Sequence, residues 1–521
     1  MTRFNRRNFL KNTVLSLAIL ASSTAFVQQL SAAEKSVLIS RVHNDISMLD
    51  PAFAGNVPDE AVMGAIYNKL VYYKPGSKWG WELQAAESIE QTDPTHISFT
   101  LKPGITFSND FGEMTAEDVK YSFERIIDPA MKSPNADNWS ALDHVEVTDR
   151  YSGVIVLKEP SQALWSLTLP YISGNIISKK ATESVGGKFA TNPPAISGPY
   201  RIKEWLPKEA VILERNPQWT GEITGYDEIQ IRQIDDEKTA EIAFEAGDID
   251  FTRVSLSSLG RYREEAPENS QLIENPSLYY VWLGMNFDHP KLQDIRVRQA
   301  IQSAIDIPSI ISAAYFDAVA PANGIIAPGL IGHRPEPGIP HKADFAKSKA
   351  LLKEAGAENL ELDLDILNKS TFVTSAQVIQ ATLAQAGIKL NINLHESGAF
   401  WSLGDEKAGD RYKNIQLIMN RYAMAPDPSY ATVWFTTAQK GIWNWERFAN
   451  AEFDTLHNKA TSEGDATKRD QMYRDMQTLM EDSGGYRFIT HEATPVIHRN
   501  TVKPALRPDG EPLYRLFQPA K

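Results

Sequence analysis

The chain has 521 residues, 42% of them hydrophobic, and a formal net charge of −13. At ~150 residues per domain this length predicts two or three lobes, and the acidic charge argues against nucleic-acid binding, which needs clustered positive charge. The chain has no cysteine, which excludes disulfides, thiolate metal ligands and cysteine nucleophiles.

Residues 1–33 form a targeting pattern with four basic residues and no acidic one, so their removal leaves a charge of about −17. The sequence Arg-Arg-Asn-Phe-Leu-Lys at residues 6–11 resembles a twin-arginine export signal. The apolar segment at residues 13–27 is shorter than a membrane span, and small residues at 31–33 offer a cleavage site before Glu34. An ordinary secretory signal and an uncleaved anchor are the alternatives. We predict an exported, periplasmic protein that is free of the membrane.

The first half of the body alternates strand and helix patterns. Residues 57–73 predict a helix that runs into a short strand, and residues 237–246 predict another helix. Thr115 with an acid three residues later is a capping-box pattern, for a helix that ends before Pro129. Strands are predicted at residues 36–42, 97–101, 105–107, 145–148, 153–157, 196–202, 211–214, 229–234 and 249–251. This alternation predicts an α/β fold with mixed sheets.

The stretch from Tyr279 to Asp306 predicts a buried strand and the helix that follows it. Residues 279–285 are an apolar run that suits a strand buried on both faces. Asp294 can cap a following helix, which should end before Pro308. Two interpretations remain open: a core strand followed by an ordinary surface helix, or the passage of the chain from one lobe into another.

The second half carries strand–helix–strand units of its own. Helices are predicted at residues 344–355 and 371–385, and strands at residues 361–368, 390–394, 486–490 and 496–497. Residues 291–480 therefore predict a second α/β lobe, and the C-terminal segment is expected to return to the first lobe.

Nine short segments along the chain, in this order, carry a family resemblance. They are Leu49-Asp50-Pro51, residues 97–129, 197–205, 213–219, 243–250, 283–310 and 351–356, the dipeptide Asp427-Pro428, and residues 448–456. Together they resemble the extracellular solute-binding proteins that serve ATP-binding-cassette (ABC) importers. The most similar group is family 5, which includes dipeptide-, oligopeptide- and nickel-binding proteins.

The resemblance implies a two-lobed periplasmic binding protein fold with mixed sheets, an inserted subdomain and two hinge crossings. Lobe I would comprise residues 34–75, 198–285 and 492–521, with residues 76–197 inserted into it, and lobe II would comprise residues 286–491. The strand at residues 279–285 and the segment near residues 485–490 would be the crossings.

The resemblance also implies a monomer that captures a small-molecule ligand between its lobes without chemistry. It would deliver that ligand to an inner-membrane ABC permease. No phosphate-cradling Gly-x-x-x-x-Gly-Lys-Ser/Thr motif occurs, so the ATPase subunits must be separate chains. No cofactor, bound metal or nucleic acid is expected.

Two residues near the Asp-Pro dipeptide are candidates for ligand contact. In the family's peptide-binding members, a carboxylate just ahead of this turn meets the free amine of the peptide. The matching position here holds Met424, which puts free dipeptides in doubt. Arg421 would favour a ligand carboxylate or phosphate, because its planar fork can donate two parallel hydrogen bonds, unless it pairs with an acid of its own lobe. Asp427 either contacts ligand or, in our main interpretation, caps a helix over residues 429–435.

Aromatic residues gather in the same region. Trp443 and Trp445 flank Asn444 in a predicted loop, where large rings often form contact surface and can stack on a sugar. Tyr422 joins this group of ligand candidates. The aromatic residues predicted to pack in the core are Phe400, Trp401, Tyr430 and Trp434.

The candidates in lobe I are His43, Asn44 and Asp45, because they follow the strand predicted at residues 36–42. The alternative is a solvated loop. The resemblance and these residues lead to our functional prediction, a receptor for a peptide-like or opine-like solute. An oligosaccharide-binding member of the same family is the second possibility.

The sequence begins one enzyme motif but does not complete it. His491-Glu492 begins like a zinc-protease helix, but Pro495 stands where the second histidine is required. A secreted glycoside hydrolase is the alternative from a different class, because the abundant carboxylates allow a catalytic pair. We predict a binding protein rather than an enzyme.

Overall fold

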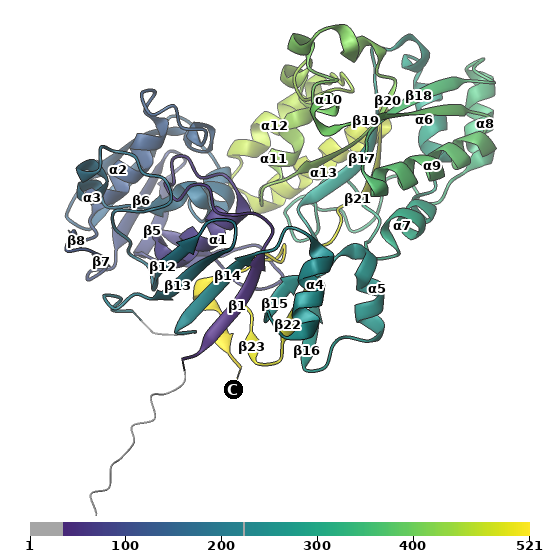
Figure 1. The fold of residues 1–521 in the computed structure, drawn as a ribbon. Helices are drawn as coiled ribbons and strands as arrows, with labels where there is room; N and C mark the ends of the chain where they lie inside the picture. The colour runs from purple at the N-terminus through teal and green to yellow at the C-terminus, as the bar shows by residue number, and fades with distance from the viewer. Residues whose placement is uncertain (1–34, 222–224, 521) are drawn as a thin grey trace, which may run out of the picture. The chain divides into compact units, whose positions relative to one another are not determined.

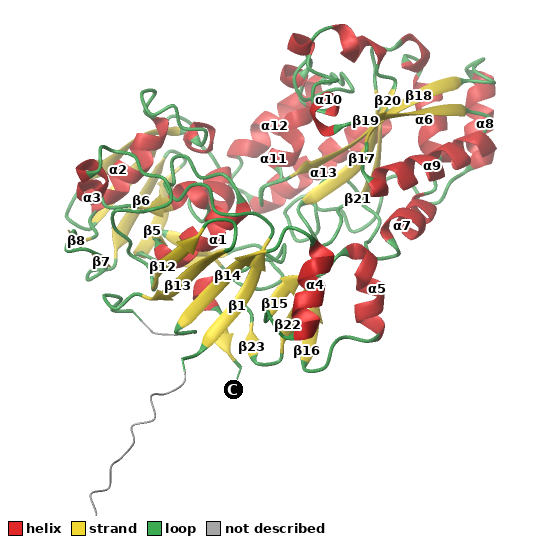
Figure 2. Ribbon diagram, viewed as in Figure 1, coloured by secondary structure: helices red, strands yellow, loops and turns green. Residues whose placement is uncertain are grey.

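The computed structural model describes residues 35–221 and 225–520. Ser36–Lys521 form one compact unit of sheets with helices against them (Figures 1 and 2). The predicted mixed α/β architecture is confirmed. The predicted export signal lies outside the described residues. Among the described helices, none is long and apolar enough to cross a membrane.

Lobe I is built on a seven-stranded mixed sheet with the order β12-β13-β14-β1-β15-β22-β16. β14, β1 and β15 are parallel, whereas β22 is antiparallel to β15 and β16. Because β22 belongs to the C-terminal segment, the chain returns to this sheet at its end. The strands are β1 (Val37–Val42), β12 (Tyr200–Leu206), β13 (Ala210–Arg215), β14 (Glu228–Gln233), β15 (Phe251–Arg253), β16 (Ser270–Ile273) and β22 (Val496–Arg499).

Three helices accompany this sheet: α1 (Val57–Ile66), α4 (Glu237–Ala246) and α5 (Leu256–Glu264). α4 has the predicted bounds for a local reason. The Asp236 side chain accepts a hydrogen bond from the Thr239 N–H at the first turn. Gly247 ends the helix with φ +89°, a left-handed conformation that glycine adopts without steric cost.

An inserted subdomain carries a four-stranded antiparallel sheet with the order β5-β6-β10-β9. The predicted hairpin is confirmed as β9 and β10. The predicted capping box is also confirmed, because the Thr115 and Asp118 side chains each bond the other's backbone at the start of α2. The elements are β5 (Ala86–Asp93), β6 (His96–Leu101), α2 (Ala116–Ile127), β9 (Leu142–Val147) and β10 (Ser152–Leu157).

A buried ion pair ties the N-terminal segment to the inserted subdomain. The Asp50 side chain is fully buried and accepts hydrogen bonds from Arg125 Nη1 and Nη2, at 2.6 and 3.0 Å. Arg125 lies on α2, so the Leu49-Asp50-Pro51 segment has a structural role in fixing this helix.

Short elements connect these two sheets. They are β2 (Asn68–Lys69), β3 (Val71–Tyr73), β4 (Trp81–Leu83), β7 (Thr106–Phe107), β8 (Gly112–Glu113), β11 (Asn175–Ile176), α3 (Lys179–Ser184), the 3₁₀ helix η9 (Tyr514–Leu516), β23 (Val502–Lys503) and β24 (Gln518–Pro519).

Lobe II is built on a five-stranded sheet with the order β19-β18-β20-β17-β21. The strands are β17 (Tyr279–Met285), β18 (Glu361–Leu367), β19 (Lys389–His395), β20 (Leu417–Ala423) and β21 (Tyr486–Thr490). The helices are α6 (Ile295–Ala304), α7 (Ile307–Tyr315), α8 (Phe345–Glu354), α9 (Ser370–Gln385), α10 (Ser397–Phe400), α11 (Ser429–Thr432), α12 (Ala451–Ser462) and α13 (Ala466–Asp482).

β17 is buried on both faces, as the apolar run predicts. Val281, Leu283 and Met285 belong to one hydrophobic cluster, and Tyr280 and Trp282 belong to another. The structure differs from the prediction in the sheet to which the strand belongs. β17 pairs with β20 and β21 inside the sheet of lobe II, so the chain crosses between the lobes before this strand and not within it.

The helix after β17 is capped by Asp294 and ends before Pro308, as predicted. α6 ends at Ala304, but a second helix, α7, begins at Ile307. Pro308 lies in the first turn of α7, where a missing N–H costs no hydrogen bond. Asp306 caps α7 by accepting from the Ser309 N–H at 3.1 Å. The proline therefore lies at the start of a second helix, which was not predicted from the sequence.

Candidate functional site

A cavity lies where β14, β1 and β15 end. Because these strands are parallel, their carboxyl ends meet at one edge of the sheet. Ligands of open α/β sheets bind beyond such edges. The cavity has a volume of about 540 Å³. It is lined by Arg41, His43, Asp235, Asp236, Glu237, Lys238, Arg253, Ser255 and Ser257.

Three cations and three carboxylates line this cavity, and two of the cations are arginines. Arg41 donates hydrogen bonds to the carbonyl oxygens of Ile234 and Asp235, at 2.6 and 2.8 Å. Arg253 forms an ion pair with Glu511 of the C-terminal segment. Burial acts to lower the pKa of Arg253, but Glu511 outweighs it and raises that pKa above the usual value.

His43 is half-buried beside these arginines. Burial lowers the pKa of its imidazole, and the positive charges of Arg253 and Arg41 lower it further. His43 is therefore uncharged at neutral pH and can offer one donor and one acceptor to a ligand.

A second charged group lies on lobe II, at the end of β20 and just after β21. Arg421 donates from Nε and Nη2 to the Glu492 carboxylate, at 3.0 and 2.8 Å. The guanidinium carbon lies 3.3 Å from the centre of the Tyr279 ring. Glu492 has φ +59°, a conformation uncommon outside glycine that is often found at functional positions. Burial acts against the charge of Arg421, but Glu492 and Tyr279 together raise its pKa.

The two charged groups lie within electrostatic reach of each other. Partial desolvation by the surrounding protein lowers the pKa of Lys369, at the start of α9, while Glu492 and Glu237 act to raise this pKa and Arg421 acts to lower it. Glu237 lines the cavity of lobe I, whereas Glu492 pairs with Arg421. Tyr279 of lobe II likewise affects the pKa of Arg253. Charged side chains from both lobes thus surround one region.

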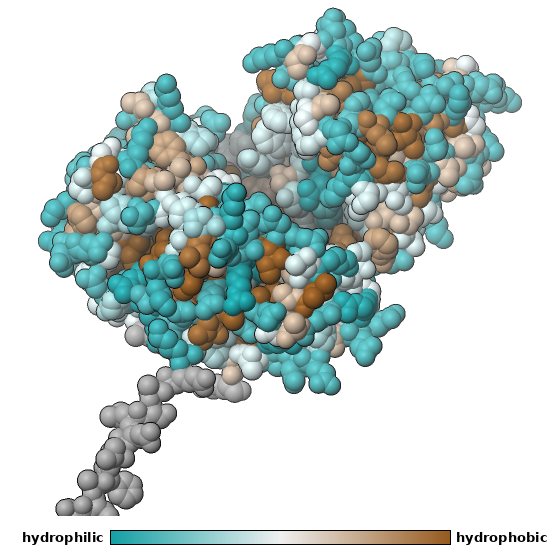
Figure 3. Space-filling model, viewed as in Figure 1, coloured by the Kyte–Doolittle hydropathy of each residue, from teal (hydrophilic) through white to brown (hydrophobic). Residues whose placement is uncertain are grey.

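Aromatic rings cover the part of lobe II beside this region. Trp401, Tyr430 and Trp443 are each 38% exposed. Trp443 lies 6.0 Å from Tyr422 and 6.1 Å from Trp434, measured between ring centres. Burial raises the pKa of Tyr430, and the charge of Asp137 in the inserted subdomain raises it further. Figure 3 shows the surface hollowed between the part that carries α2 and the part that carries α10 and α12.

Two of the predicted aromatic-loop candidates are buried. Asn444 is fully buried, and its amide donates to the carbonyl oxygens of Phe435, Thr436 and Phe448. Trp445 is 2% exposed and donates to the Ile442 carbonyl oxygen. Both side chains stabilise the loop that presents Trp443.

Tyr422 is 9% exposed and donates its hydroxyl to the Trp443 carbonyl oxygen at 3.1 Å. It therefore supports the aromatic surface from beneath. The structure differs from the prediction for Trp401 and Tyr430, which lie at the surface and not in the core, whereas Phe400 is fully buried as predicted.

The three predicted ligand contacts in the loop after β1 lie in different environments. His43 lines the cavity, and Asn44 is exposed. The Asp45 carboxylate accepts hydrogen bonds from Trp205 Nε1 at 3.0 Å and from the Lys208 N–H at 2.7 Å. Asp45 therefore anchors the loop between β12 and β13.

Asp427 lies in a dense network. Its fully buried carboxylate accepts from the Ser429 N–H at 2.9 Å, at the start of α11, as a capping residue does. It also pairs with Arg469 at 2.9 Å and accepts from the Ser166 hydroxyl at 2.7 Å. Ser166 belongs to the inserted subdomain, so Asp427 joins that subdomain to lobe II.

Several residues of this region were not predicted from the sequence to contact a ligand. Glu492 was considered only as part of a zinc-protease motif and Tyr279 only as part of a strand. Arg253 and Glu511 were not singled out. The position of Arg253 at the carboxyl end of β15 is the signal that identifies it. Among the described residues, no group of three or more histidine and acidic side chains is arranged to hold a metal ion.

Comparisons with known proteins agree on one family. The model described as bacterial extracellular solute-binding proteins, family 5 Middle, matches residues 81–442. The glutathione-binding protein GsiB of Shigella flexneri is 24% identical over 475 residues, which cover 89% of this chain and 90% of that protein.

Solved structures show the same fold. HbpA2 from Haemophilus parasuis has a TM-score of 0.81 at 22% identity, covering 93% of this chain and 100% of that chain. The periplasmic binding protein DppA from Helicobacter pylori, in complex with the peptide STSA, has a TM-score of 0.73 at 24% identity. The match covers 94% of this chain and 99% of that chain. The family consists of substrate-binding proteins and not of enzymes, which sets aside the glycoside hydrolase. The chain therefore belongs to family 5 of the bacterial extracellular solute-binding proteins, as a solute-binding component of an ABC transporter.

Proposed function

We propose that the chain captures a peptide-like or opine-like solute that carries a carboxylate. The observation that supports this most is a set of two arginine–carboxylate pairs, Arg253 with Glu511 and Arg421 with Glu492. A solute with both a carboxylate and an amine suits such a mixed set, because each of its charges finds an opposite charge. The names of GsiB and of the DppA complex, a glutathione binder and a peptide complex, point to the same class of solute.

Arg421 already pairs with an acid, Glu492, and is the proposed anchor for the ligand carboxylate through the donor that this pair leaves. Glu492 and Tyr279 hold its guanidinium in one orientation, which reduces the entropy lost when a ligand binds. Glu492 takes bonds from Nε and Nη2, which leaves Nη1 for Tyr279 or for a ligand. Lys369 is a second cation in reach; it is exposed and forms no ion pair within the described part of the chain.

Replacing Arg421 by alanine should weaken the binding of a carboxylate-bearing solute by at least roughly tenfold, the order expected for losing a charge-assisted hydrogen bond. Isothermal calorimetry with glutathione and with the peptide Ser-Thr-Ser-Ala would measure this. Glu492→Gln is the companion variant, since it loosens Arg421 but keeps the cation. An unchanged dissociation constant in Arg421→Ala would rule out the anchor role.

The exposed aromatic surface supports the second candidate, an oligosaccharide. Trp443 and Trp401 present rings on which a sugar face can stack. If the solute is a sugar, maltotriose should raise the melting temperature of the protein, and Trp443→Ala should abolish that shift. If the solute is peptide-like, maltotriose should have no effect, and glutathione or Ser-Thr-Ser-Ala should stabilise instead.

We further propose that a twin-arginine-like signal exports the protein and that the mature chain serves an inner-membrane permease with separate ATPase subunits. This proposal rests on the sequence of residues 6–11 and on the family. Mass spectrometry of the protein from an osmotic-shock fraction should find Glu34 as the first residue. An intact Met1 in the cytosol would contradict export.

A further inference from the structure

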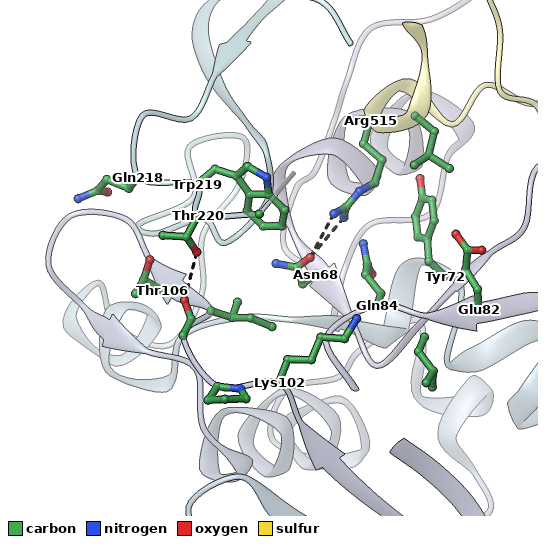
Figure 4. Close-up of a pocket in the computed structure, with 16 residues that line it drawn as sticks. Asn68, Tyr72, Glu82, Gln84, Lys102, Thr106, Gln218, Trp219, Thr220 and Arg515 are labelled. Atoms are coloured by element: carbon green, nitrogen blue, oxygen red, sulfur yellow. Dashed lines mark hydrogen bonds between the residues drawn. The ribbon is translucent and has the colours of Figure 1, made fainter. Parts of the chain in front are cut away.

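A second cavity lies between the seven-stranded sheet and the inserted subdomain, and it shares no residue with the cavity at the end of β1. Its volume is about 440 Å³, within the range of small-molecule sites. Figure 4 shows it between η9, β2 and the loop after β6. Apolar side chains that line it are Leu83, Pro103, Ile105 and Leu516.

The cavity contains the guanidinium of Arg515 and, on its lining, the carboxylate of Glu82, which acts on the pKa of Arg515 without forming an ion pair with it. Arg515 donates to the Tyr67 carbonyl oxygen at 3.1 Å and reaches Asn68 Oδ1 only at 3.4 Å. In the part of the chain that the structure describes, no carboxylate pairs with it. Burial lowers the pKa of Arg515, but an arginine stays charged at neutral pH. Arg515 is half-buried and makes no ion pair within the described residues, so a bound carboxylate could still accept hydrogen bonds from it.

Two further side chains with hydrogen-bond donors, Gln84 and Lys102, line the same cavity. Gln84 uses its Oε1 to accept from the Lys69 N–H at 2.7 Å, while its buried Nε2 has no hydrogen-bond partner. A buried amide donor left without a partner requires an explanation such as a bound group. In Figure 4 the Lys102 side chain extends toward Gln84, on the side of the cavity opposite Arg515.

Aromatic rings flank the guanidinium. The Arg515 guanidinium carbon lies 5.4 Å from the centre of the Tyr72 ring and 5.7 Å from that of Trp219. A Cβ at Gly221 would overlap the Trp219 ring, so the glycine allows the loop to lie against this ring. Flat walls beside a planar fork suit a planar ligand better than a tetrahedral one.

We propose that this cavity is a second binding site, separate from the region between the lobes, for a small organic carboxylate with an apolar body. Arg515 binds the carboxylate, Gln84 Nε2 donates a further hydrogen bond to it, and Lys102 adds positive charge from the opposite side of the cavity. The apolar lining holds the body of the ligand. Inorganic phosphate has the charge but neither the planar head nor the apolar body, so it should bind more weakly.

The test uses 4-fluorobenzoate as probe and the mature protein, followed by ¹⁹F NMR titration. Lys102 is exposed, so Lys102→Glu should fold normally, and it should weaken binding at least about tenfold by placing a negative charge at the site. Arg515→Gln should do the same. Lys349→Glu, on the exposed face of α8, makes the same change of charge far from the cavity and should leave binding within about twofold.

Four outcomes would overturn the proposal. Absence of 4-fluorobenzoate binding would end it, as would an equal loss in Lys102→Glu and Lys349→Glu. A loss in Arg421→Ala alone would place the probe between the lobes instead. Inorganic phosphate that competes as strongly as the probe would refute the assignment to carboxylates. Because Arg421→Ala leaves this cavity intact, failure here and failure of the proposed function give different results.

Discussion

Replacing Asp427 by alanine should lower the free energy of unfolding by roughly 3–5 kcal/mol, the range for breaking a buried ion pair. The variant leaves Arg469 buried without its carboxylate and removes the acceptor for the Ser429 N–H. Burial alone would raise the pKa of Asp427, but Arg469 and the hydrogen bonds outweigh it and lower the pKa below 3.8. The pair therefore stabilises the fold above that pH and loses its effect as the pH falls through the lowered value.

Urea unfolding at neutral pH measures this loss, with Asp475→Ala as control. Asp475 is an exposed aspartate on α13, the helix that carries Arg469, and its removal should change stability by less than about 0.5 kcal/mol. The dissociation constant for the bound solute should stay within about twofold in Asp427→Ala. A large loss of affinity with unchanged unfolding would instead make Asp427 a ligand contact.

Replacing Glu446 by glutamine should stabilise the protein above pH 7 by about 3 kcal/mol. This figure is the rise of the Glu446 pKa from 4.5 to about 7, multiplied by 1.36 kcal/mol per pKa unit. Glu446 is 1% exposed, and its Oε1 accepts from Trp282 Nε1 at 2.7 Å while its Oε2 has no partner. Burial raises its pKa from 4.5 to about 7. The folded state thus binds more protons than the unfolded state between these values, and stability falls as the pH rises through that window.

Glutamine keeps the hydrogen-bond acceptor for Trp282 and cannot ionise. The free energy of unfolding of the variant, relative to that of the native protein, should therefore increase from pH 4.5 to about 7 and then stay constant. Paired urea unfolding curves of the variant and the native protein at pH 5, 6, 7 and 8 measure this. Glu452→Gln, at an exposed position of α12, should show almost no such trend. A difference between Glu446→Gln and the native protein that does not vary with pH would mean that Glu446 ionises normally.

Much of the fold could be predicted because local chemistry decides it. The apolar run Tyr279–Met285 and the cap of α4 by Asp236 need only neighbours in the sequence. The sheet to which β17 belongs could not be predicted, since Ile418 and Tyr486, which flank Gly284, are distant in the chain. The end of α6 before Pro308 could be predicted because a proline restricts the residue before it, whereas α7 was missed, although a proline is well tolerated in a first helical turn.

The candidate site was less predictable, because it depends on partners far apart in the chain. Arg421 stood out by its type and position, but Glu492 lies 71 residues away and only the fold brings them together. Asn444 resembled a contact residue between two tryptophans, yet three carbonyl oxygens use its amide. Whether a polar side chain in a loop faces solvent or satisfies buried backbone depends on the tertiary structure.

Native mass spectrometry of the mature protein, purified from the periplasm without dialysis against denaturant, tests the central claim most directly. If the chain holds a small solute between two lobes, a fraction of the protein should carry one added molecule of low mass. That mass should vanish after unfolding and refolding and return when the identified compound is added back. A single mass equal to that of the bare chain, together with no mass gain in a concentrated periplasmic extract, would contradict a solute receptor.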